Sequence, residues 1–326
     1  MLVQLSDIRM TPGHGDDEVK QAAEAAAGTQ FRTFRILRKS LDARNKNNIF
    51  YSYKVAGEID DLYAGVLIDS GQAQPYEEAA VPRTGRIQAP RRVVIVGSGP
   101  AGLFCTLRLM EAGASVMIIE RGRPVEERFR DIGRLETDGI LDIESNVLFG
   151  EGGAGTYSDG KLTSRSSRPE SSWFYEKLIE HGADPAVSYL AKPHIGTDKL
   201  REIIRSIRYT LTGAGAEIHF GERVNGLIIR DGSVEGAVTD LGEYRADAVV
   251  LAAGHSARDT FAMLNEKGIC LEKKAFAMGT RIEHPAEYIN SIQYGRSRYR
   301  DILPAAEYFL TYNNRSTGRG TYTFCM

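Results

Sequence analysis

The chain has 326 residues, of which 42% are hydrophobic and 26% charged, and its formal net charge is −2. This length suits one large domain or two ordinary ones, and the composition is that of a globular protein. The weak net charge gives no electrostatic signature for nucleic acid or for an anionic membrane. No apolar run approaches the length of a membrane span, and the N-terminus lacks the pattern of a secretory signal. We therefore expect a cytoplasmic protein with neither nucleic-acid nor membrane partners.

Residues 1–75 are predicted to form a small α+β module. The segment 1–10 is compatible with a strand, and residues 16–28 are rich in helix formers and end on a glycine. Two further strands are predicted within 31–45 and 48–59, where β-branched and aromatic residues recur. The order strand, helix, strand, strand is typical of a ferredoxin-like module.

A linker is predicted over residues 76–91, which are poor in large apolar side chains. The chain then continues as a Rossmann-like domain over 92–270, interrupted by inserted β-rich segments. Residues 271–326 are expected to begin a β-rich substrate or cap domain. Within it, two strands with a turn at Asn313–Asn314 are predicted near the end of the chain.

A glycine cluster follows the apolar run 92–96 directly, with glycines at 97, 99 and 102. In such a strand–turn–helix unit, the first glycine permits a tight turn and the second lets the backbone approach a pyrophosphate. The third allows the helix to pack closely on the strand. Pro100 suits the first helical turn, because the N–H group that it lacks would be unpaired there. The helix N-terminus itself offers free N–H groups to an anion.

The next predicted strand ends on Glu120, close to the roughly 20-residue spacing expected of a dinucleotide site. A carboxylate there can accept hydrogen bonds from both hydroxyls of a ribose, and it disfavours a 2′-phosphate. The sequence therefore predicts a dinucleotide site that is unsuited to NADP. At this point FAD and NAD both remain open.

After Glu120 the chain does not continue into further strand–helix units, as NAD enzymes usually do. It runs through a long, arginine-rich stretch, residues 121–165, which we expect to be loop. A second glycine cluster lies within it, at residues 150–155. Long loops of this kind are usually functional.

These segments carry a resemblance. The glycine turn, the strand ending on Glu120 and the second glycine cluster together resemble flavoproteins of the glutathione-reductase-like superfamily. More narrowly, the chain resembles an uncharacterised FAD-dependent dehydrogenase family found in many bacteria. The further segments that carry this likeness are residues 38–44, 194–200 and 279–285.

The resemblance implies FAD as the cofactor. It implies that the first glycine turn holds the pyrophosphate, that Glu120 holds the adenosine ribose, and that the backbone at Val224 meets the adenine. The implied cofactor-binding residues are Gly97, Ser98, Gly99, Pro100, Ala101, Gly102, Glu120, Arg121, Gly152, Gly153, Ala154, Gly155, Thr156, Ser158, Lys161, Val224, Ala253 and Gly254.

Two flavoprotein subclasses fit poorly. The three cysteines are far apart and form no CxxC pair, which disfavours a disulfide reductase. An Ala253–Gly254 pair stands where an aromatic hydroxylase would carry Asp-Gly. The prediction that remains is a FAD-dependent dehydrogenase or reductase that acts on a small molecule, with NAD(P)H as a transient reductant.

Candidate proton donors are His194, His255 and His284, because histidine titrates near neutral pH. Among them, His255 follows the strand-ending Gly254 and is expected to be nearest the cofactor. An ordinary structural role is the competing expectation for each of the three. No metal site is predicted.

Two alternative functions stay open. One is an NAD-binding dehydrogenase that uses the same glycine turn, and the other is a non-catalytic fragment that binds a nucleotide. Flavoproteins of this superfamily place a Gly-Asp segment near the C-terminus, against the flavin, and no such segment stands at the corresponding place here. The expectation is therefore a C-terminally truncated chain that holds FAD weakly or not at all.

Overall fold

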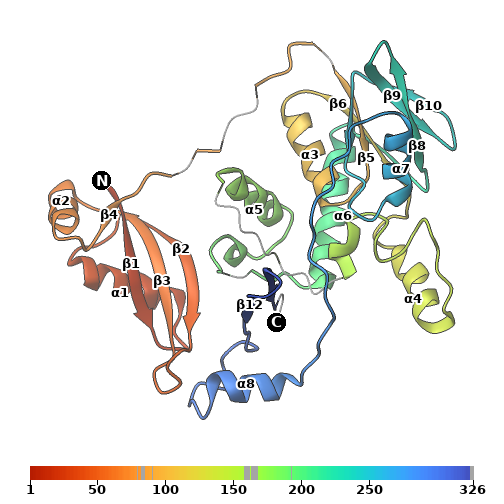
Figure 1. The fold of residues 1–326 in the computed structure, drawn as a ribbon. Helices are drawn as coiled ribbons and strands as arrows, with labels where there is room; N and C mark the ends of the chain where they lie inside the picture. The colour runs from red at the N-terminus through yellow and green to blue at the C-terminus, as the bar shows by residue number, and fades with distance from the viewer. Residues whose placement is uncertain are drawn as a thin grey trace. The chain divides into compact units, whose positions relative to one another are not determined.

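The computed structural model describes residues 1–78, 80–81, 85–89, 91–157, 162, 168–191 and 193–323. They form two compact units (Figure 1). The first unit comprises Met1–Ala79, Ser188–Pro193 and Phe276–Met326, and the second comprises Ala80–Val187 and His194–Ala275. The boundary after Ala79 falls inside the predicted linker.

The N-terminal part of the first unit is a four-stranded antiparallel sheet with two helices. Its elements are β1 (Leu2–Met10), α1 (Asp16–Ala27), β2 (Thr33–Asp42), β3 (Phe50–Glu58), α2 (Asp61–Asp69) and β4 (Gln74–Pro75). The strands are ordered β2-β3-β1-β4, and every adjacent pair is antiparallel. This is the βαββαβ arrangement of ferredoxin-like folds. Sequence reasoning anticipated its first four elements, and α2 and β4 complete it.

Helix α1 packs on this sheet through small and branched side chains. Val19 and Ala23 of α1 are fully buried, as are Val3 and Val55 of the sheet. The helix ends where the sequence predicts, because Gly28 adopts the left-handed conformation with φ 65°.

Three more segments belong to the first unit. Residues near Leu190 run alongside β2, where Lys39 donates its backbone N–H to the carbonyl of Tyr189 over 2.8 Å. Further along the chain lie α8 (Ala286–Tyr294) and a hairpin of β12 (Thr311–Asn314) and β13 (Arg319–Tyr322).

The predicted turn at Asn313–Asn314 is wrong, because both residues belong to β12. The turn follows them. The side-chain oxygen of Asn314 accepts hydrogen bonds from the backbone N–H groups of Ser316 and Thr317. Asparagine thus acts here by capping the turn from the end of the strand rather than by occupying it.

The second unit is an α/β domain. Its strands are β5 (Arg92–Val96), β6 (Ser115–Glu120), β7 (Glu217–Phe220), β8 (Val224–Arg230), β9 (Ser233–Thr239), β10 (Glu243–Arg245) and β11 (Ala248–Leu251). Its helices are α3 (Pro100–Glu111), α4 (Arg128–Asp138), η1 (Gly153–Tyr157), α5 (Glu170–Glu180), η2 (Pro185–Ser188), α6 (Thr197–Gly213) and α7 (Arg258–Glu266).

Four of these strands form a parallel sheet in the order β11-β5-β6-β7, and β8, β9 and β10 form a separate antiparallel sheet. The chain winds outward from β5 through β6 to β7 and then returns to β11 on the other side. The strand order therefore reverses between β5 and β11. In open α/β sheets, ligands bind at this switch point, beyond the carboxyl ends of the strands.

The parallel sheet is covered on both faces. On one face, Ile95 and Ile118 pack with Ile203 of α6, and all three are fully buried. On the other face, Val94 packs with Ala237 of the antiparallel sheet. Burial on both faces explains why β5 and β6 read as continuous apolar runs rather than alternating ones.

The expectation of loop throughout 121–165 is wrong in part, because α4 and η1 lie within it. Helix α4 buries Arg128 and Asp131 together with Ile132. A helix whose buried face carries charged side chains gives no apolar periodicity to detect.

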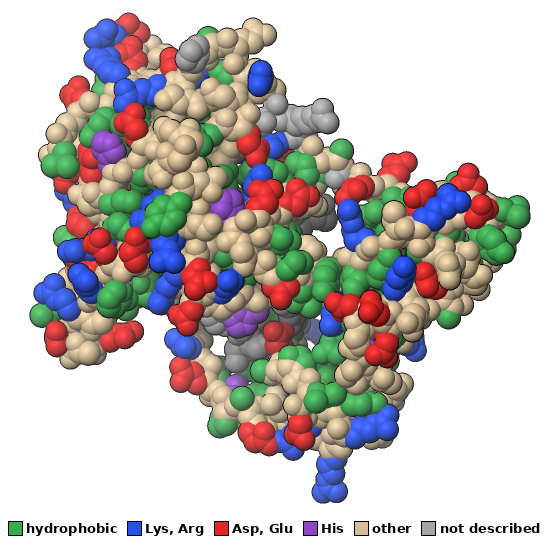
Figure 2. Space-filling view, turned by 180° about the vertical axis from the view of Figure 1, so that it is seen from behind, with side chains coloured by type: hydrophobic (Ala, Val, Ile, Leu, Met, Phe, Trp, Pro, Cys, Tyr) green, Lys and Arg blue, Asp and Glu red, His purple; other side chains and the backbone are tan. Residues whose placement is uncertain are grey.

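No described helix is long and apolar enough to cross a membrane. On the face drawn in Figure 2, basic and acidic side chains are interspersed rather than gathered into one patch.

Candidate cofactor site

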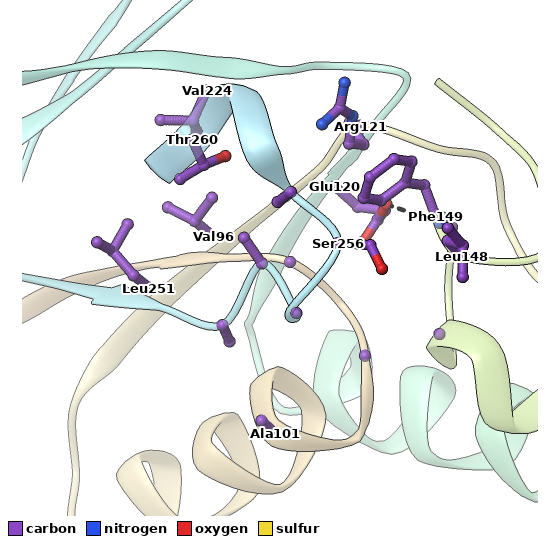
Figure 3. A pocket seen from close by; sticks show the side chains of 18 of the residues that line it. Val96, Ala101, Glu120, Arg121, Leu148, Phe149, Val224, Leu251, Ser256 and Thr260 are labelled. Carbon is purple, nitrogen blue, oxygen red and sulfur yellow. Dashed lines mark hydrogen bonds between the residues drawn. The ribbon is translucent and has the colours of Figure 1, made fainter. Parts of the chain in front are cut away.

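A pocket of about 400 Å³ opens in the second unit beyond the ends of β5 and β11, and we call it the main pocket. It is lined by the β5–α3 turn, the end of β6, residues 148–150 and 153–154, residues 222–224 and the turn from β11 into α7 (Figure 3). The pocket thus occupies the switch point of the sheet, where a nucleotide site is expected on topological grounds.

The three glycines of the β5–α3 turn play different structural roles. Gly97 has φ +103°, and a Cβ there would lie 2.6 Å from the carbonyl oxygen of Ala252. A Cβ on Gly102 would lie 1.9 Å from the carbonyl oxygen of Gly97. A Cβ on Gly99 would meet no atom within 4 Å. Gly97 and Gly102 are therefore required by packing, as predicted, whereas Gly99 leaves open the space that a ligand could fill.

Helix α3 begins at this open space. Gly99 is its N-cap and provides no side-chain hydrogen bond, and Pro100 occupies the first helical position. Within the described residues, the backbone N–H groups of Ala101 and Gly102 have no hydrogen-bond partner. Unpaired N–H groups at the positive end of a helix dipole suit a phosphate, so the residues present fit a dinucleotide pyrophosphate.

Glu120 lines the main pocket but is only 4% exposed, because its carboxylate is held by the protein. One oxygen accepts hydrogen bonds from the backbone N–H and the hydroxyl of Ser98, at 2.8 and 2.9 Å. The other accepts from the N–H groups of Gly122 and Gly150, at 2.8 and 3.0 Å. A carboxylate offers about four acceptor positions, so all are in use. Glu120 therefore joins three loops, and a ribose hydroxyl would have to displace or share one of these donors.

Arg121 forms the wall beside Glu120. Its guanidinium contacts Glu144 at 2.7 Å and Asp259 at 3.1 Å, and it lies 4.2 Å from the centre of the Phe149 ring. Burial disfavours the charged form, but the hydrogen bonds to Glu144 and Asp259 outweigh it and raise the pKa of Arg121. This guanidinium is already neutralised by two carboxylates and stacked on an aromatic ring.

The segment 145–157, which carries the second glycine cluster, is organised by a buried arginine. Arg128 has no exposed surface, and its guanidinium donates to the carbonyl oxygens of Asn146, Glu151 and Gly153 at 2.7, 2.6 and 2.9 Å. It also donates to the hydroxyl of Thr156 at 2.8 Å. A single side chain therefore fixes the backbone whose other side, at Gly153, lines the main pocket.

A second buried ionisable side chain lies within the same segment. Glu151 is fully buried, accepts the Val125 N–H at 2.8 Å and lies 3.3 Å from the guanidinium of Arg208. Burial raises the pKa of Glu151 to about 7, against the opposing effects of the Val125 N–H and of Arg208. Its side chain therefore changes charge near neutral pH, beside the residues of this segment that line the main pocket.

The structure brings most of the predicted residues to the main pocket. Those that line it are Gly97, Gly99, Pro100, Ala101, Glu120, Arg121, Gly153, Ala154, Val224, Ala253 and Gly254. Those that the structure describes elsewhere than in its lining are Ser98, Gly102, Gly152, Gly155 and Thr156. Ser158 and Lys161 lie outside the described residues.

Several residues that line the pocket were not predicted from the sequence, among them Leu148, Phe149, Glu222, Arg223, Leu251, Ser256 and Thr260. Phe149 stands directly before the second glycine cluster, which is the one signal that could have drawn attention to it. Of the three candidate histidines, only His255 is in the described lining of the pocket.

Three family models match parts of the chain. Residues 91–133 match "FAD binding domain", and residues 275–326 match "FAD-dependent protein, C-terminal domain-like". Residues 2–58 match a domain of unknown function, DUF8436. The FAD binding domain match covers the β5–α3 turn, β6 and the first residues of α4.

Two curated relatives are similar to the chain. An uncharacterised protein of Clostridium beijerinckii is 38% identical over 294 residues, which are 89% of this chain and 55% of the relative. A 6-methylpretetramide 4-monooxygenase of Streptomyces rimosus is 32% identical over 180 residues, which are 53% of this chain and 40% of the relative. The chain spans about half the length of the curated relatives it matches.

Among solved structures, THI4 of Thermovibrio ammonificans has a TM-score of 0.37 at 20% identity, over 56% of this chain and 64% of its own. The L-proline dehydrogenase of P. horikoshii also has a TM-score of 0.37, at 13% identity, over 56% of this chain and 57% of its own. These low scores describe a partial likeness only.

Proposed function

We propose that the chain binds FAD in the main pocket and belongs to a FAD-dependent oxidoreductase of the glutathione-reductase-like type. The observation that carries the proposal is the α3 N-terminus. Its unpaired N–H groups and Gly99, where a Cβ would meet no protein atom within 4 Å, lie at the switch point of a parallel sheet. The match of residues 91–133 to the FAD binding domain supports FAD as the dinucleotide.

In this proposal, the N–H groups of α3 bind the pyrophosphate, and the side chains around Val96 and Val224 exclude water from the base. Glu120 and Arg128 act from behind by fixing the loops that line the pocket. FAD supplies the electron transfer when it is bound, and the protein supplies binding and orientation. His255 stays a candidate proton donor, because it lines the same pocket.

We further propose that the reaction is a dehydrogenation or reduction of a small molecule, with NAD(P)H as a transient reductant.

No feature of the main pocket favours NAD over FAD as the bound group. The adenosine diphosphate half is common to both, so the two cofactors differ only in what extends beyond it.

Binding of FAD is tested by titrating the purified chain and following the change in flavin fluorescence, with ADP and NAD⁺ as competitors. The expected result is weak but saturable binding that reaches one FAD per chain, with displacement by ADP and weaker competition by NAD⁺. Tighter binding of NAD⁺ than of FAD would contradict the proposal of a FAD site and favour an NAD-binding dehydrogenase instead. Absence of binding by any of the three would refute the proposal.

Oxidoreductase function is tested on the FAD-loaded chain under anaerobic conditions. Addition of NADH or NADPH is expected to bleach the flavin absorbance, and oxygen is expected to restore it. If neither NADH nor NADPH reduces the bound flavin, the proposed reductant is refuted, whereas the proposal that the chain binds FAD still stands.

A further inference from the structure

The side chains of the main pocket divide into two groups (Figure 3). Val96, Val224, Leu251 and Thr260 lie together on one side, and we call this the apolar end. Glu120, Arg121 and Phe149 lie on the other side. The only polar side-chain atom that this apolar group carries is the hydroxyl oxygen of Thr260.

That hydroxyl has no partner within the part of the chain that the structure describes, although Thr260 is only 8% exposed. Three threonines that lie deeper in their helices use theirs. Thr106, Thr137 and Thr212 each donate to the carbonyl four residues earlier, at 2.8, 2.9 and 3.0 Å. Thr260 stands in the first turn of α7 instead, and its oxygen points into the pocket beside Val224 (Figure 3).

The Thr260 residue is more than nine-tenths buried, and its unpaired hydroxyl oxygen is open only toward the pocket, where a ligand can bind it. A phosphate is a poor candidate, because the carboxylate of Asp259 already lies in the first turn of α7, next to Thr260. Asp259 accepts the Thr260 backbone N–H at 3.0 Å and pairs with Arg121 at 3.1 Å. The ligand group that fits the apolar end is therefore uncharged, with flat apolar faces and a polar edge.

From this geometry we propose that Thr260 is a specificity-determining residue that hydrogen-bonds the edge of the nucleotide base. The apolar walls at Val96, Val224 and Leu251 cover the faces of the base, and the Thr260 hydroxyl is its polar anchor. A hydroxyl both donates and accepts, so it can meet a ring nitrogen or an exocyclic amine. This inference rests on the proposed function, and it names the residue that reads the base.

The test is equilibrium binding of ADP to the full chain and to T260V and T260S. Valine keeps the shape of threonine but not the hydroxyl, and serine keeps the hydroxyl. The expected result is about tenfold weaker ADP binding by T260V, the fold-change for one buried hydrogen bond, with affinity near wild type for T260S. Thermal unfolding of the free chains is the folding control, because both variants are expected to melt as the wild type does.

Base analogues of ADP then identify the contact. We use 7-deaza-ADP, 3-deaza-ADP, 1-deaza-ADP and the purine analogue without the exocyclic amine, which together probe every polar position of the base. One of these analogues is expected to bind the wild type about tenfold more weakly than ADP, and T260V should cause no further loss with it. That non-additivity is the signature of a direct contact.

Equal loss on T260V for every analogue would place the hydroxyl elsewhere than on the base and overturn the inference. So would ADP affinity that T260V leaves unchanged. In either case FAD binding by the wild type would still support the proposed function. A wild type that binds neither ADP nor FAD overturns both.

Discussion

Two regions of the second unit line the same pocket and are built by opposite means. The β5–α3 turn is shaped by what its residues lack, because Gly97 and Gly102 allow backbone contacts that any side chain would prevent. The segment 145–157 is shaped by a charge, because the buried guanidinium of Arg128 holds its carbonyl oxygens. Comparing the two shows that a ligand loop can be fixed by close packing or by a buried ion.

The largest effect is expected where the buried charge is removed. R128M leaves the carbonyl oxygens of Asn146, Glu151 and Gly153 without their donor. We expect the free energy of unfolding to fall by about 4 kcal/mol, as for other broken buried charge networks. Urea denaturation measures it. The matched control is R130M, an exposed arginine on the same helix, where a change under about 0.5 kcal/mol is expected.

The β5–α3 turn should be almost as sensitive to a single added methyl group. In G102A the new Cβ would lie 1.9 Å from the carbonyl oxygen of Gly97, so the strand and helix must separate. We expect a loss of about 3 kcal/mol in the free energy of unfolding. A variant with wild-type stability would show that the turn relaxes freely and would remove the contrast with segment 145–157.

The charge-based region should also respond to pH in a way that the glycine turn does not. The pKa of Glu151 is raised to about 7, above its unfolded value, so the folded state holds the proton more tightly. Its contribution to stability is complete below about pH 4.5 and is lost as pH rises to about 7. E151Q removes the titration. We expect the difference in unfolding free energy between wild type and E151Q to change by up to roughly 3 kcal/mol across this range. A constant difference from pH 4.5 to pH 7 would contradict the assignment.

The smallest effect is expected at a glycine that has no such packing role. Gly133 lies inside α4, and a Cβ there would meet nothing within 4 Å. We expect G133A to stabilise the chain by about 1 kcal/mol, from helix propensity alone. Thermal unfolding checks the sign. Destabilisation would mean that α4 depends on more than its buried Arg128.

The same contrast explains which parts of the fold and of the pocket could be predicted from the sequence. The turn at 97–102 was predictable because glycine spacing, flanking apolar runs and a closing acid are all local signals. Helix α4 was not predictable from periodicity, because its buried face carries Arg128 and Asp131. Glu120 lines the pocket, and its predicted role in holding a ribose stays a prediction. However, nothing local indicated that N–H groups from residue 98 and residue 150 would occupy its oxygens.

The first unit shows the same limits. Its strands β1 to β3 and helix α1 follow from alternation, helix formers and the stop at Gly28. Strand β4 has only two residues, too few for a periodic signal. The turn after β12 was missed because Asn314 caps it through its side chain from the strand end.

The most direct test of the central claim compares the wild type with G99A in ADP binding by calorimetry. A Cβ at Gly99 meets no protein atom within 4 Å, so it enters only the space assigned to the pyrophosphate. We expect G99A to melt at the wild-type temperature and to bind ADP at least about tenfold more weakly, a loss of about 1.4 kcal/mol. Equal affinity of the two chains for ADP would contradict the assignment of this turn to the phosphates.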